Sequence, residues 1–305
     1  AANFDFLMSR WLDDVVIVPA LGAPVAFMDF IEKRGCQLVD TTCGDVMKVW
    51  KRVRGYAKDG VTSIIHGKAD HEETRATASR ALGTDGNGHF LVILTLNDAE
   101  RLCHYIQHGG DKTEFMQHFS GSHSANFDPD LHLIMLGVAN QTTMLKGETE
   151  EIQRRIREAV IKRDGDDSRF HCFDTICGAT QERQDALIDM LGEPMDLMLV
   201  VGGYNSSNTA HLVEIAEKEL PTFFIRDSSC LRSMEEICHF DLHQHQETLT
   251  RQAAWLNPDQ ATKIGITAGA SCPNNLIEET VLKVFELRGI SQSELLGAIQ
   301  PSSQD

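Results

Sequence analysis

Two short stretches of the sequence place a cysteine in nearly the same setting. Residues 40–44 read DTTCG and residues 174–178 read DTICG, so Cys43 and Cys177 each lie between an Asp-Thr-X run and a glycine. A helix-like run follows each glycine, and the N-terminus of a helix favours thiolate over thiol. A thiolate is the form that binds iron or attacks an electrophile. The repeat predicts one shared functional site; the alternative is that both cysteines are small buried residues of duplicated domains.

A second group of polar residues has the composition of anion-binding loops. The stretch GGYNSSNTAHL provides Ser206, Ser207 and Asn208 at the start of a helix pattern, and TAGASCPNN provides Ser271 before another. Hydroxyl groups, a carboxamide and free amides at helix N-termini suit a phosphate or diphosphate. The alternative is ordinary helix capping, for which Ser and Asn are the usual residues.

Two further loops carry groups suited to proton transfer. The stretch HGKADHEET holds His66, His71 and Glu73, and a histidine near a carboxylate can bind an anion and deliver a proton. The alternative for this loop is a solvated helix start with acidic residues in its first turn.

The stretch NQTTMLKGETEE holds Gln141 and Thr142, neutral hydrogen-bonding groups that could orient a hydroxyl group. The alternative is a threonine that caps a helix whose exposed face is KGETEE.

Five segments that contain most of these residues share one order: an apolar run of strand length, a loop of small and polar residues, and a helix pattern. The apolar runs carry Val, Ile and Leu at successive positions, as strands do when both faces of a sheet are covered. Alternating strands and helices indicate an α/β protein with mostly parallel sheets, and such sheets bind ligands beyond the carboxyl ends of their strands. The segments are VVIVPALGAPVAFMDFIEK, TSIIHGKADHEETRATASRAL, LIMLGVANQTTMLKGETEEIQRRIREAV, LMLVVGGYNSSNTAHLVEIAEKE and KIGITAGASCPNNLIEETVLKVFEL.

Length and composition exclude several classes of protein. A chain of 305 residues is expected to form more than one domain. The net charge of -17 argues against a general binder of nucleic acids or anionic membranes. Eight irregularly spaced cysteines without a C-x-x-C pair argue against a secreted disulfide scaffold, a thioredoxin-like motif and a zinc ribbon. The sequence shows no apolar run of membrane-spanning length and no signal peptide.

Domain boundaries are predicted at the two cysteine motifs. They divide the chain into a partial first α/β domain over 1–43, a second over 44–177 with a polar surface insertion near 110–132, a third over 178–290, and a tail over 291–305. The first strand pattern follows soon after the first residue, so the first domain is expected to be incomplete. The last residues of the tail, QPSSQD, are expected to be disordered.

Six motifs, in this order along the chain, resemble the 4-hydroxy-3-methylbut-2-enyl diphosphate reductases, and most closely their plant and cyanobacterial branch. They are DTTCGDVMKVW, HGKADHEET, NQTTMLKGETEEI, DTICGATQERQDA, VVGGYNSSNTAHL and GITAGASCPNN. The resemblance implies three similar α/β domains around a central 4Fe-4S cluster, held by one cysteine from each domain, with one iron left open for substrate. It also implies an oxidoreductase of the non-mevalonate isoprenoid pathway, which removes a hydroxyl group reductively to give isopentenyl and dimethylallyl diphosphate.

The same resemblance implies roles for individual residues. Cys43 and Cys177 correspond to two cluster ligands. Glu73 corresponds to the family's proton-delivering glutamate, and Thr142 to its partner near the substrate hydroxyl. The residues that match diphosphate contacts, or lie beside them, are His71, Gln141, Ser206, Ser207, Asn208 and Ser271, with His66 as an alternative to His71.

One departure from the family leaves the ligand set open. The family's first cluster cysteine lies in a segment resembling Gly-Phe-Cys-x-Gly-Val, which this sequence does not contain. Cys36, Cys172 and Cys272 are alternatives for the third ligand, although no motif supports them.

Three hypotheses about function follow from this departure. The first is an active reductase whose first segment lies outside this sequence, the second is a cluster-free member of the same family, and the third is a non-catalytic protein that binds phosphorylated metabolites. An active reductase implies an electron donor such as ferredoxin or flavodoxin, and a location in the bacterial cytoplasm or the plastid stroma.

Overall fold

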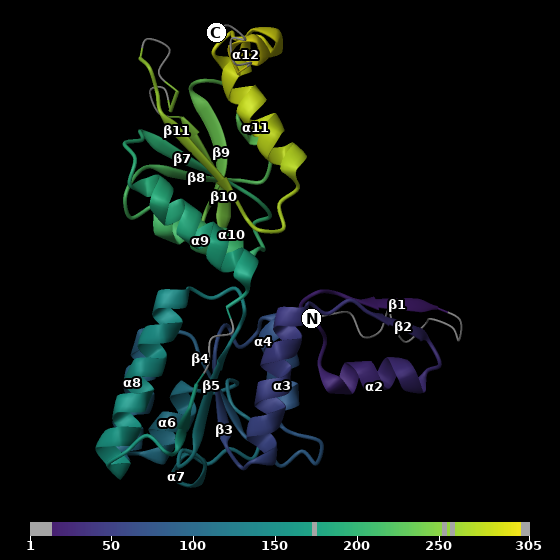
Figure 1. Cartoon of the computed structure of the whole chain (residues 1–305), viewed down its shortest axis with the longest axis vertical. Coiled ribbons are helices and arrows are strands. Elements are labelled where there is room, and N and C mark those ends of the chain that lie inside the picture. The colour runs from purple at the N-terminus through teal and green to yellow at the C-terminus, as the bar shows by residue number, and fades with distance from the viewer. Residues whose placement is uncertain (1–13, 173–175, 252–254, 257–259, 300–305) are drawn as a thin grey trace, which may run out of the picture. The chain divides into compact units, whose positions relative to one another are not determined.

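A computed structural model of the chain describes residues 14–172, 176–251, 255–256 and 260–299 (Figure 1). The chain divides into two compact units, Ala1–Cys177 (unit 1) and Gly178–Asp305 (unit 2), and each is described by itself. The first residues of the predicted partial domain and the QPSSQD tail lie outside the described residues. The division into three domains stays a prediction.

Unit 1 contains two parallel sheets. The smaller sheet pairs β1 (Val15–Val18) with β2 (Gln37–Asp40). The larger sheet has the order β4-β3-β5-β6, formed by β3 (Thr62–His66), β4 (Phe90–Ile93), β5 (Leu136–Asn140) and β6 (Phe170–His171). The helices are α2 (Val25–Lys33), α3 (Gly44–Lys58), α4 (Glu72–Ala81), α5 (Leu96–His108), α6 (Lys112–His118), α7 (Pro129–His132) and α8 (Lys146–Asp164).

Both faces of the larger sheet are covered by helices, as the unbroken apolar runs predict. Strands β3 and β5 are buried along their whole length. Residues of α5 and α8 pack with Ile64 and Val138 on one face, whereas residues of α3 pack with Ala139 on the other; Figure 1 shows α8 and α3 on opposite sides of the sheet. Burial of one such Ile side chain contributes about 2 kcal/mol, so the sheet forms a rigid base for the loops at its edges.

The predicted polar surface insertion near 110–132 is only partly at the surface, which corrects the expectation. Phe119 and Phe127 from this segment are buried in the core beside α5. The amide of Val92 donates to the carbonyl of Ser122 at 2.6 Å, and the amide of Ser124 donates to the carbonyl of Phe90 at 3.1 Å. The two aromatic side chains stand among polar residues in the sequence. Their buried apolar area stabilises the segment against β4.

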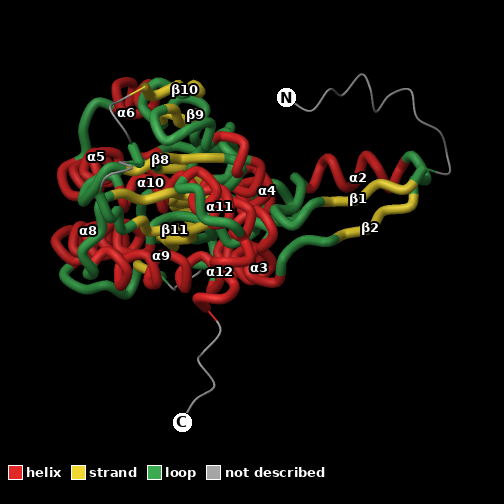
Figure 2. The backbone as a smooth tube through the Cα atoms, turned by 90° about the horizontal axis from the view of Figure 1, so that it is seen from above, coloured by secondary structure: helices red, strands yellow, loops and turns green. Residues whose placement is uncertain are grey.

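An arginine of α4 helps to join the segment of the smaller sheet to the rest of unit 1. The Arg80 guanidinium donates to the carbonyl of Ala23 at 2.7 Å and lies 3.2 Å from the centroid of the Trp50 ring. Burial lowers the pKa of Arg80 to about 10, with a smaller effect from the charge of Arg54, so the group still carries its charge at neutral pH. Figure 2 shows α2 alongside β1 and β2.

Unit 2 is built on one five-stranded sheet of the order β10-β9-β8-β7-β11. Its strands are β7 (Leu197–Val201), β8 (Thr222–Ile225), β9 (Glu236–Asp241), β10 (Gln246–Arg251) and β11 (Ile264–Ala268). Its helices are α9 (Gly178–Leu191), α10 (Ser207–Ala216), the 3-10 helix η1 (Ser228–Cys230), α11 (Asn274–Leu287) and α12 (Gln292–Ile299). Helix α12 lies within the range predicted as tail.

Successive side chains of β7 point to opposite faces of this sheet, as they do in any β-strand. Leu199 and Val201 pack with residues of α11, whereas Met198 and Val200 pack with residues of α9 and α10. Strands β7, β8 and β11 are parallel, and β9 and β10 form an antiparallel hairpin at one edge.

The α/β class with mostly parallel sheets is therefore confirmed, and all five predicted strand-loop-helix segments form. The hairpin was not predicted, because its strands carry mixed polar residues rather than an apolar run. No helix in the described part of the chain is both long and apolar enough to cross a membrane.

A glycine in β5 is required by packing. A Cβ atom added at Gly137 would lie 2.5 Å from the ring of Tyr56 on α3. We expect Gly137→Ala to lower the free energy of unfolding by about 1–3 kcal/mol, because the strand and helix must move apart. Urea unfolding followed by circular dichroism measures this change.

Gly55 in the last turn of α3 is the control, since a Cβ there would meet nothing within 4 Å. Gly55→Ala should raise the free energy of unfolding by about 0.5–1 kcal/mol, as alanine does in a helix. Equal effects of the two substitutions would contradict the packing described here.

Candidate functional site

The carboxyl ends of β3 and β5 bring a glutamate and a threonine together in unit 1. The two strands are parallel neighbours in which His66 pairs with Asn140, so the loops that follow both strands start at the same edge of the sheet. The amide of Thr142 donates to Glu73 Oε1 at 2.6 Å, and Thr142 Oγ1 donates to Glu73 Oε2 at 3.0 Å. Both oxygens of one carboxyl group are thus held by a single residue in the loop that follows the neighbouring strand β5.

The Glu73 carboxyl group is set up for proton transfer. Its residue is 1% exposed. Burial raises the pKa of Glu73 from 4.5 to about 7, although the two hydrogen bonds from Thr142 act in the opposite direction. A group that titrates near neutral pH can both give and accept a proton. The alternative of a solvated helix start is wrong for Glu73.

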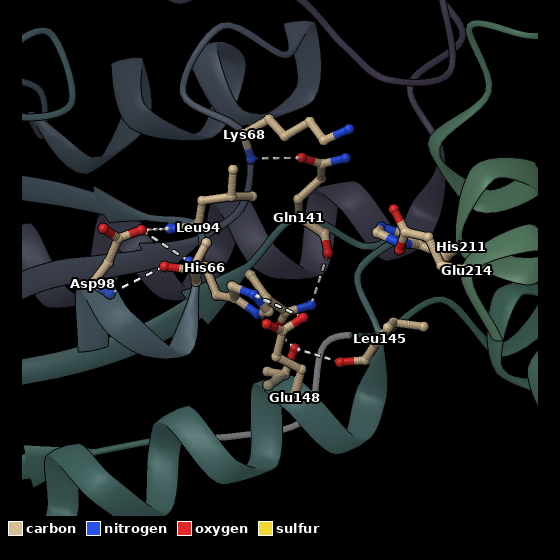
Figure 3. Close-up of polar contacts among 12 residues, drawn as sticks. His66, Lys68, Leu94, Asp98, Gln141, Leu145, Glu148, His211 and Glu214 are labelled. Carbon is tan, nitrogen blue, oxygen red and sulfur yellow. Dashed lines mark hydrogen bonds and ion pairs between the residues drawn. The ribbon is translucent and has the colours of Figure 1, made fainter. Parts of the chain in front are cut away.

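His71, and not His66, lies beside this carboxyl group. His71 is the N-cap of α4, where its Nδ1 accepts a hydrogen bond from the amide nitrogen of Glu73 at 3.2 Å. Burial lowers the pKa of His71, with a smaller effect from Lys68, so this ring is neutral at pH 7. The ring of His66 is turned toward α8 instead: its Nδ1 lies 2.8 Å from Thr149 Oγ1, and Figure 3 shows it near Glu148.

Gln141 braces the loop that carries Thr142. Its Oε1 accepts from the amide of Lys68 at 3.2 Å and from Thr74 Oγ1 at 3.1 Å, and its Nε2 donates to Thr143 Oγ1 at 2.8 Å. Figure 3 shows the Gln141 amide beside the backbone of Lys68. The side chain therefore joins the loops after β3 and β5. Helix α8 begins after Leu145, which makes no side-chain cap, so the alternative of a threonine cap is wrong.

Cys177 is joined directly to the threonine of this pair, since its amide donates to the carbonyl oxygen of Thr142 at 3.0 Å. Cys43 is the exposed N-cap residue of α3, and its amide donates to the carbonyl of Ala20 at 2.9 Å. The pKa of Lys48 is raised, mainly by its hydrogen bond to Asp45, and further by the charges of Asp45, Cys43 and Cys177. Both thiols therefore lie near enough to Lys48 to affect its pKa.

The donor groups near Lys48 are two free thiols. Soft thiolate donors suit iron–sulfur clusters and zinc. Cys43 is exposed, and a Cβ added at the neighbouring Gly44 would meet no atom within 4 Å. Among the residues that the structure describes, no group of three or more His, Cys, Asp or Glu side chains could hold a metal ion. The third ligand is therefore not identified.

The predicted anion-binding residues lie at one sheet edge of unit 2. Strands β7 and β11 are parallel neighbours, and the loops that follow them meet. Cβ atoms added at Gly202 and Gly269 would lie 2.6 and 2.2 Å from Thr209 Oγ1, so both glycines let the backbone approach this side chain. The Cβ position of Gly269 is also 3.7 Å from Ser206 Oγ. The Ser206–Asn208 loop and the loop that ends at Ser271 therefore form one surface.

Ser206 does cap its helix, as the alternative reading expected. Its oxygen accepts from the amide of Thr209 at 3.3 Å and from Thr209 Oγ1 at 3.0 Å. Capping uses the oxygen as an acceptor, and the hydroxyl proton can serve an anion at the same time. Asn208 is 6% exposed, and its Oδ1 has no hydrogen-bond partner among the described residues. Ser207 opens α10 and Ser271 is exposed.

The sites predicted from sequence thus fall into two sets. Unit 1 holds His71, Glu73, Gln141, Thr142, Cys43 and Cys177, and unit 2 holds Ser206, Ser207, Asn208 and Ser271. The sequence analysis missed Lys48, for which the only signal is its spacing from Asp45 on a helix that begins at a motif cysteine. It also missed Gly269 as the point of close approach to Thr209.

Comparisons with known proteins identify the family of this chain. The sequence model of the LytB protein family matches residues 2–285. A 4-hydroxy-3-methylbut-2-enyl diphosphate reductase of Gloeobacter violaceus is 48% identical over 290 residues, which cover 94% of this chain and 67% of the relative. A reductase of the same name from Thermosynechococcus vestitus is 48% identical over 282 residues, which cover 91% of this chain and 68% of the relative.

Solved structures share the fold. The structure of the E-1-hydroxy-2-methyl-but-2-enyl-4-diphosphate reductase from Plasmodium falciparum is similar with a TM-score of 0.64 at 21% identity, covering 94% of this chain and 73% of that one. A structure of (E)-4-hydroxy-3-methyl-but-2-enyl diphosphate reductase has a TM-score of 0.50 at 24% identity and covers 91% of this chain and 78% of its own. The resemblance that the motifs indicate is confirmed.

The raised pKa of Glu73 predicts a pH dependence of stability. The unfolded chain releases this proton near pH 4.5, whereas the folded protein keeps it to about pH 7. The wild-type protein therefore loses stability as the pH rises through this window, by at most about 3 kcal/mol. Glu73→Gln removes the titrating group, so its free energy of unfolding should exceed that of the wild type by more at pH 8 than at pH 5. Urea unfolding at both pH values measures the difference.

Glu151 provides a control, because its partly exposed carboxyl group is already ionised over this range: hydrogen bonds from Arg154 and Arg155 lower its pKa to about 2. Glu151→Gln should leave the slope between pH 5 and pH 8 unchanged. A wild-type slope in Glu73→Gln would show that the carboxyl group titrates at its ordinary pH.

Proposed function

Since this chain belongs to the LytB protein family, we propose that it is a 4-hydroxy-3-methylbut-2-enyl diphosphate reductase that forms isopentenyl and dimethylallyl diphosphate. The reaction consumes two electrons and two protons and releases the substrate hydroxyl group as water. The observation that best supports the proposal is the buried Glu73 carboxyl group, which titrates near pH 7 and is held through Thr142 beside Cys177.

In this proposal Glu73 supplies the proton to the leaving hydroxyl group. A carboxyl group with an ordinary pKa would be almost fully ionised at pH 7 and could not donate, whereas one that titrates near 7 is protonated in about half of the molecules. Thr142 keeps the carboxyl group in one orientation, because it bonds both of its oxygens. When Glu73 is protonated, its O–H can donate to Thr142 Oγ1, which leaves the Thr142 hydroxyl proton free to bond the substrate hydroxyl.

Each unit offers groups that suit phosphate oxygens of the diphosphate. In unit 1, Nδ1 of His71 accepts a hydrogen bond from the amide of Glu73, which leaves the N–H of Nε2 as a donor. Ser206, Ser207, Asn208 and Ser271 add hydroxyl groups, a carboxamide and the N-terminus of α10, all of which suit phosphate oxygens. Binding of the diphosphate would fix the organic part of the substrate for proton transfer.

Cys43 and Cys177 would hold a 4Fe-4S cluster, and the two thiols near Lys48 fit this role as two of its ligands. When bound, the cluster supplies the electrons that the reaction consumes. Those electrons would come from a donor such as ferredoxin or flavodoxin. The donor, the third ligand and the location in bacterial cytoplasm or plastid stroma stay predictions.

The proton-transfer role predicts the effect of one substitution on turnover. Glu73→Gln should lower turnover of 4-hydroxy-3-methylbut-2-enyl diphosphate at least about 100-fold, because general acid catalysis contributes on that scale. An anaerobic assay with a reduced viologen dye as donor measures turnover. Glu72→Gln is the matched control: this neighbouring side chain is exposed, and turnover should stay within about twofold. Full turnover in Glu73→Gln would exclude the assigned role.

The ligand assignment predicts the iron content. After anaerobic reconstitution with iron and sulfide, Cys43→Ser and Cys177→Ser should each bind less iron and sulfide per chain than the wild type, because each removes one thiolate. Cys238→Ser on β9 should bind as much as the wild type, since no motif surrounds Cys238. Iron retained in both motif variants, or none bound by the wild type, would contradict the assignment.

A further inference from the structure

One aromatic side chain lies inside the predicted anion-binding loop of unit 2. Tyr204 follows two glycines at the end of β7 and precedes Ser206. Its ring stacks on Phe240 of β9 with centroids 4.8 Å apart and planes 24° apart, and meets the edge of the buried Phe224 of β8 at 5.1 Å. Tyr204 therefore packs the loop against two neighbouring strands, one of which belongs to the hairpin.

The hydroxyl group of Tyr204 makes a second attachment to the hairpin. Tyr204 Oη donates to Glu247 Oε1 on β10 at 3.0 Å. Glu247 Oε1 also accepts from Arg226 Nη1 at 2.9 Å. Arg226 directly follows β8, whose carboxyl end lies beside that of β7. A chain of polar contacts thus runs from the loop through Tyr204 and Glu247 to Arg226.

The rest of the loop has few attachments of its own. A Cβ added at Gly203 would meet no atom within 4 Å, and Asn205 is exposed. The amide of Ser206 donates to the carbonyl of Gly203 at 2.9 Å, which closes a tight turn around Tyr204. A turn of this composition costs conformational entropy to order, and Tyr204 is the large side chain in it that contacts the sheet.

We propose that Tyr204 is a positioning residue for the diphosphate site, and that the hairpin strands β9 and β10 hold it through Phe240 and Glu247. The hydroxyl bond to Glu247 and the stack on Phe240 keep the turn in the form in which Ser206, Ser207 and Asn208 face an anion. Ordering the loop in advance lowers the entropy lost on binding. This inference rests on the proposed function, which assigns the diphosphate to that loop.

The test uses inorganic diphosphate as the probe and the full chain. Tyr204→Phe removes the hydroxyl bond but changes no charge and keeps the ring, so it should weaken diphosphate binding about fivefold, the effect of one ordinary hydrogen bond. Titration calorimetry measures the affinity. Amide hydrogen exchange over residues 202–208 should become faster in the same variant, and the melting temperature should stay close to that of the wild type.

Two further variants separate positioning from other effects. Glu247→Gln keeps an oxygen that accepts from Tyr204 but removes the negative charge, so binding should stay within about twofold of the wild type. Tyr105→Phe in unit 1 loses a bond of the same kind, from Tyr105 Oη to Asp130 at 2.6 Å, and should leave diphosphate binding unchanged.

Each outcome decides the proposal. Wild-type affinity in Tyr204→Phe, an equal loss in Tyr105→Phe, or a loss in Glu247→Gln as large as that in Tyr204→Phe would overturn the positioning role. Those results would leave the proposed function intact, provided that the wild type binds diphosphate. If the wild type binds no diphosphate, the assignment of the loop is wrong, and both the proposed function and this inference are contradicted.

Discussion

The two hydrogen bonds from Thr142 to the buried Glu73 carboxyl group are the constraint on which the site of unit 1 depends. Burial drives the carboxyl group toward its neutral form, and the bonds from Thr142 limit that effect enough to leave the pKa near 7. The same threonine receives the amide of Cys177 through its carbonyl oxygen. One residue therefore links the proton-transfer group to a predicted cluster ligand, and any shift of the loop after β5 would disturb both.

Parallel strand pairing explains why residues far apart in the sequence meet. Strands β3 and β5 place Glu73 and Thr142 at one sheet edge in unit 1, and strands β7 and β11 place Ser206 and Ser271 at one sheet edge in unit 2. In each unit the polar groups come from short loops on buried strands, which are rigid supports. The acidic chain, with a net charge of -17, can still bind an anion there, since backbone amides and neutral side chains supply the contacts.

Much of this arrangement follows from the sequence, because buried parallel strands leave a clear pattern. The apolar runs before Glu73, Thr142 and Ser206 predicted the strands, and the rule that ligands bind at carboxyl ends predicted the edges. The individual site residues are predicted by the resemblance of the motifs to the family. The sequence could not predict that Glu73 is 1% exposed, since that depends on how α4 packs. The sequence also did not predict the hairpin, whose Glu247 and Phe240 contact Tyr204 only after folding. Nor did it predict that Phe119 and Phe127, which stand in a polar segment, are buried.

The most direct test of the site is a titration of the Glu73 carboxyl group in the folded protein, followed by carbon-13 NMR with Glu73→Gln to assign the signal. The structure predicts a midpoint at about pH 7, which should rise further in Thr142→Val because one of the opposing hydrogen bonds is lost. A midpoint near 4.5, unchanged by Thr142→Val, would contradict the burial of this group and its pairing with Thr142.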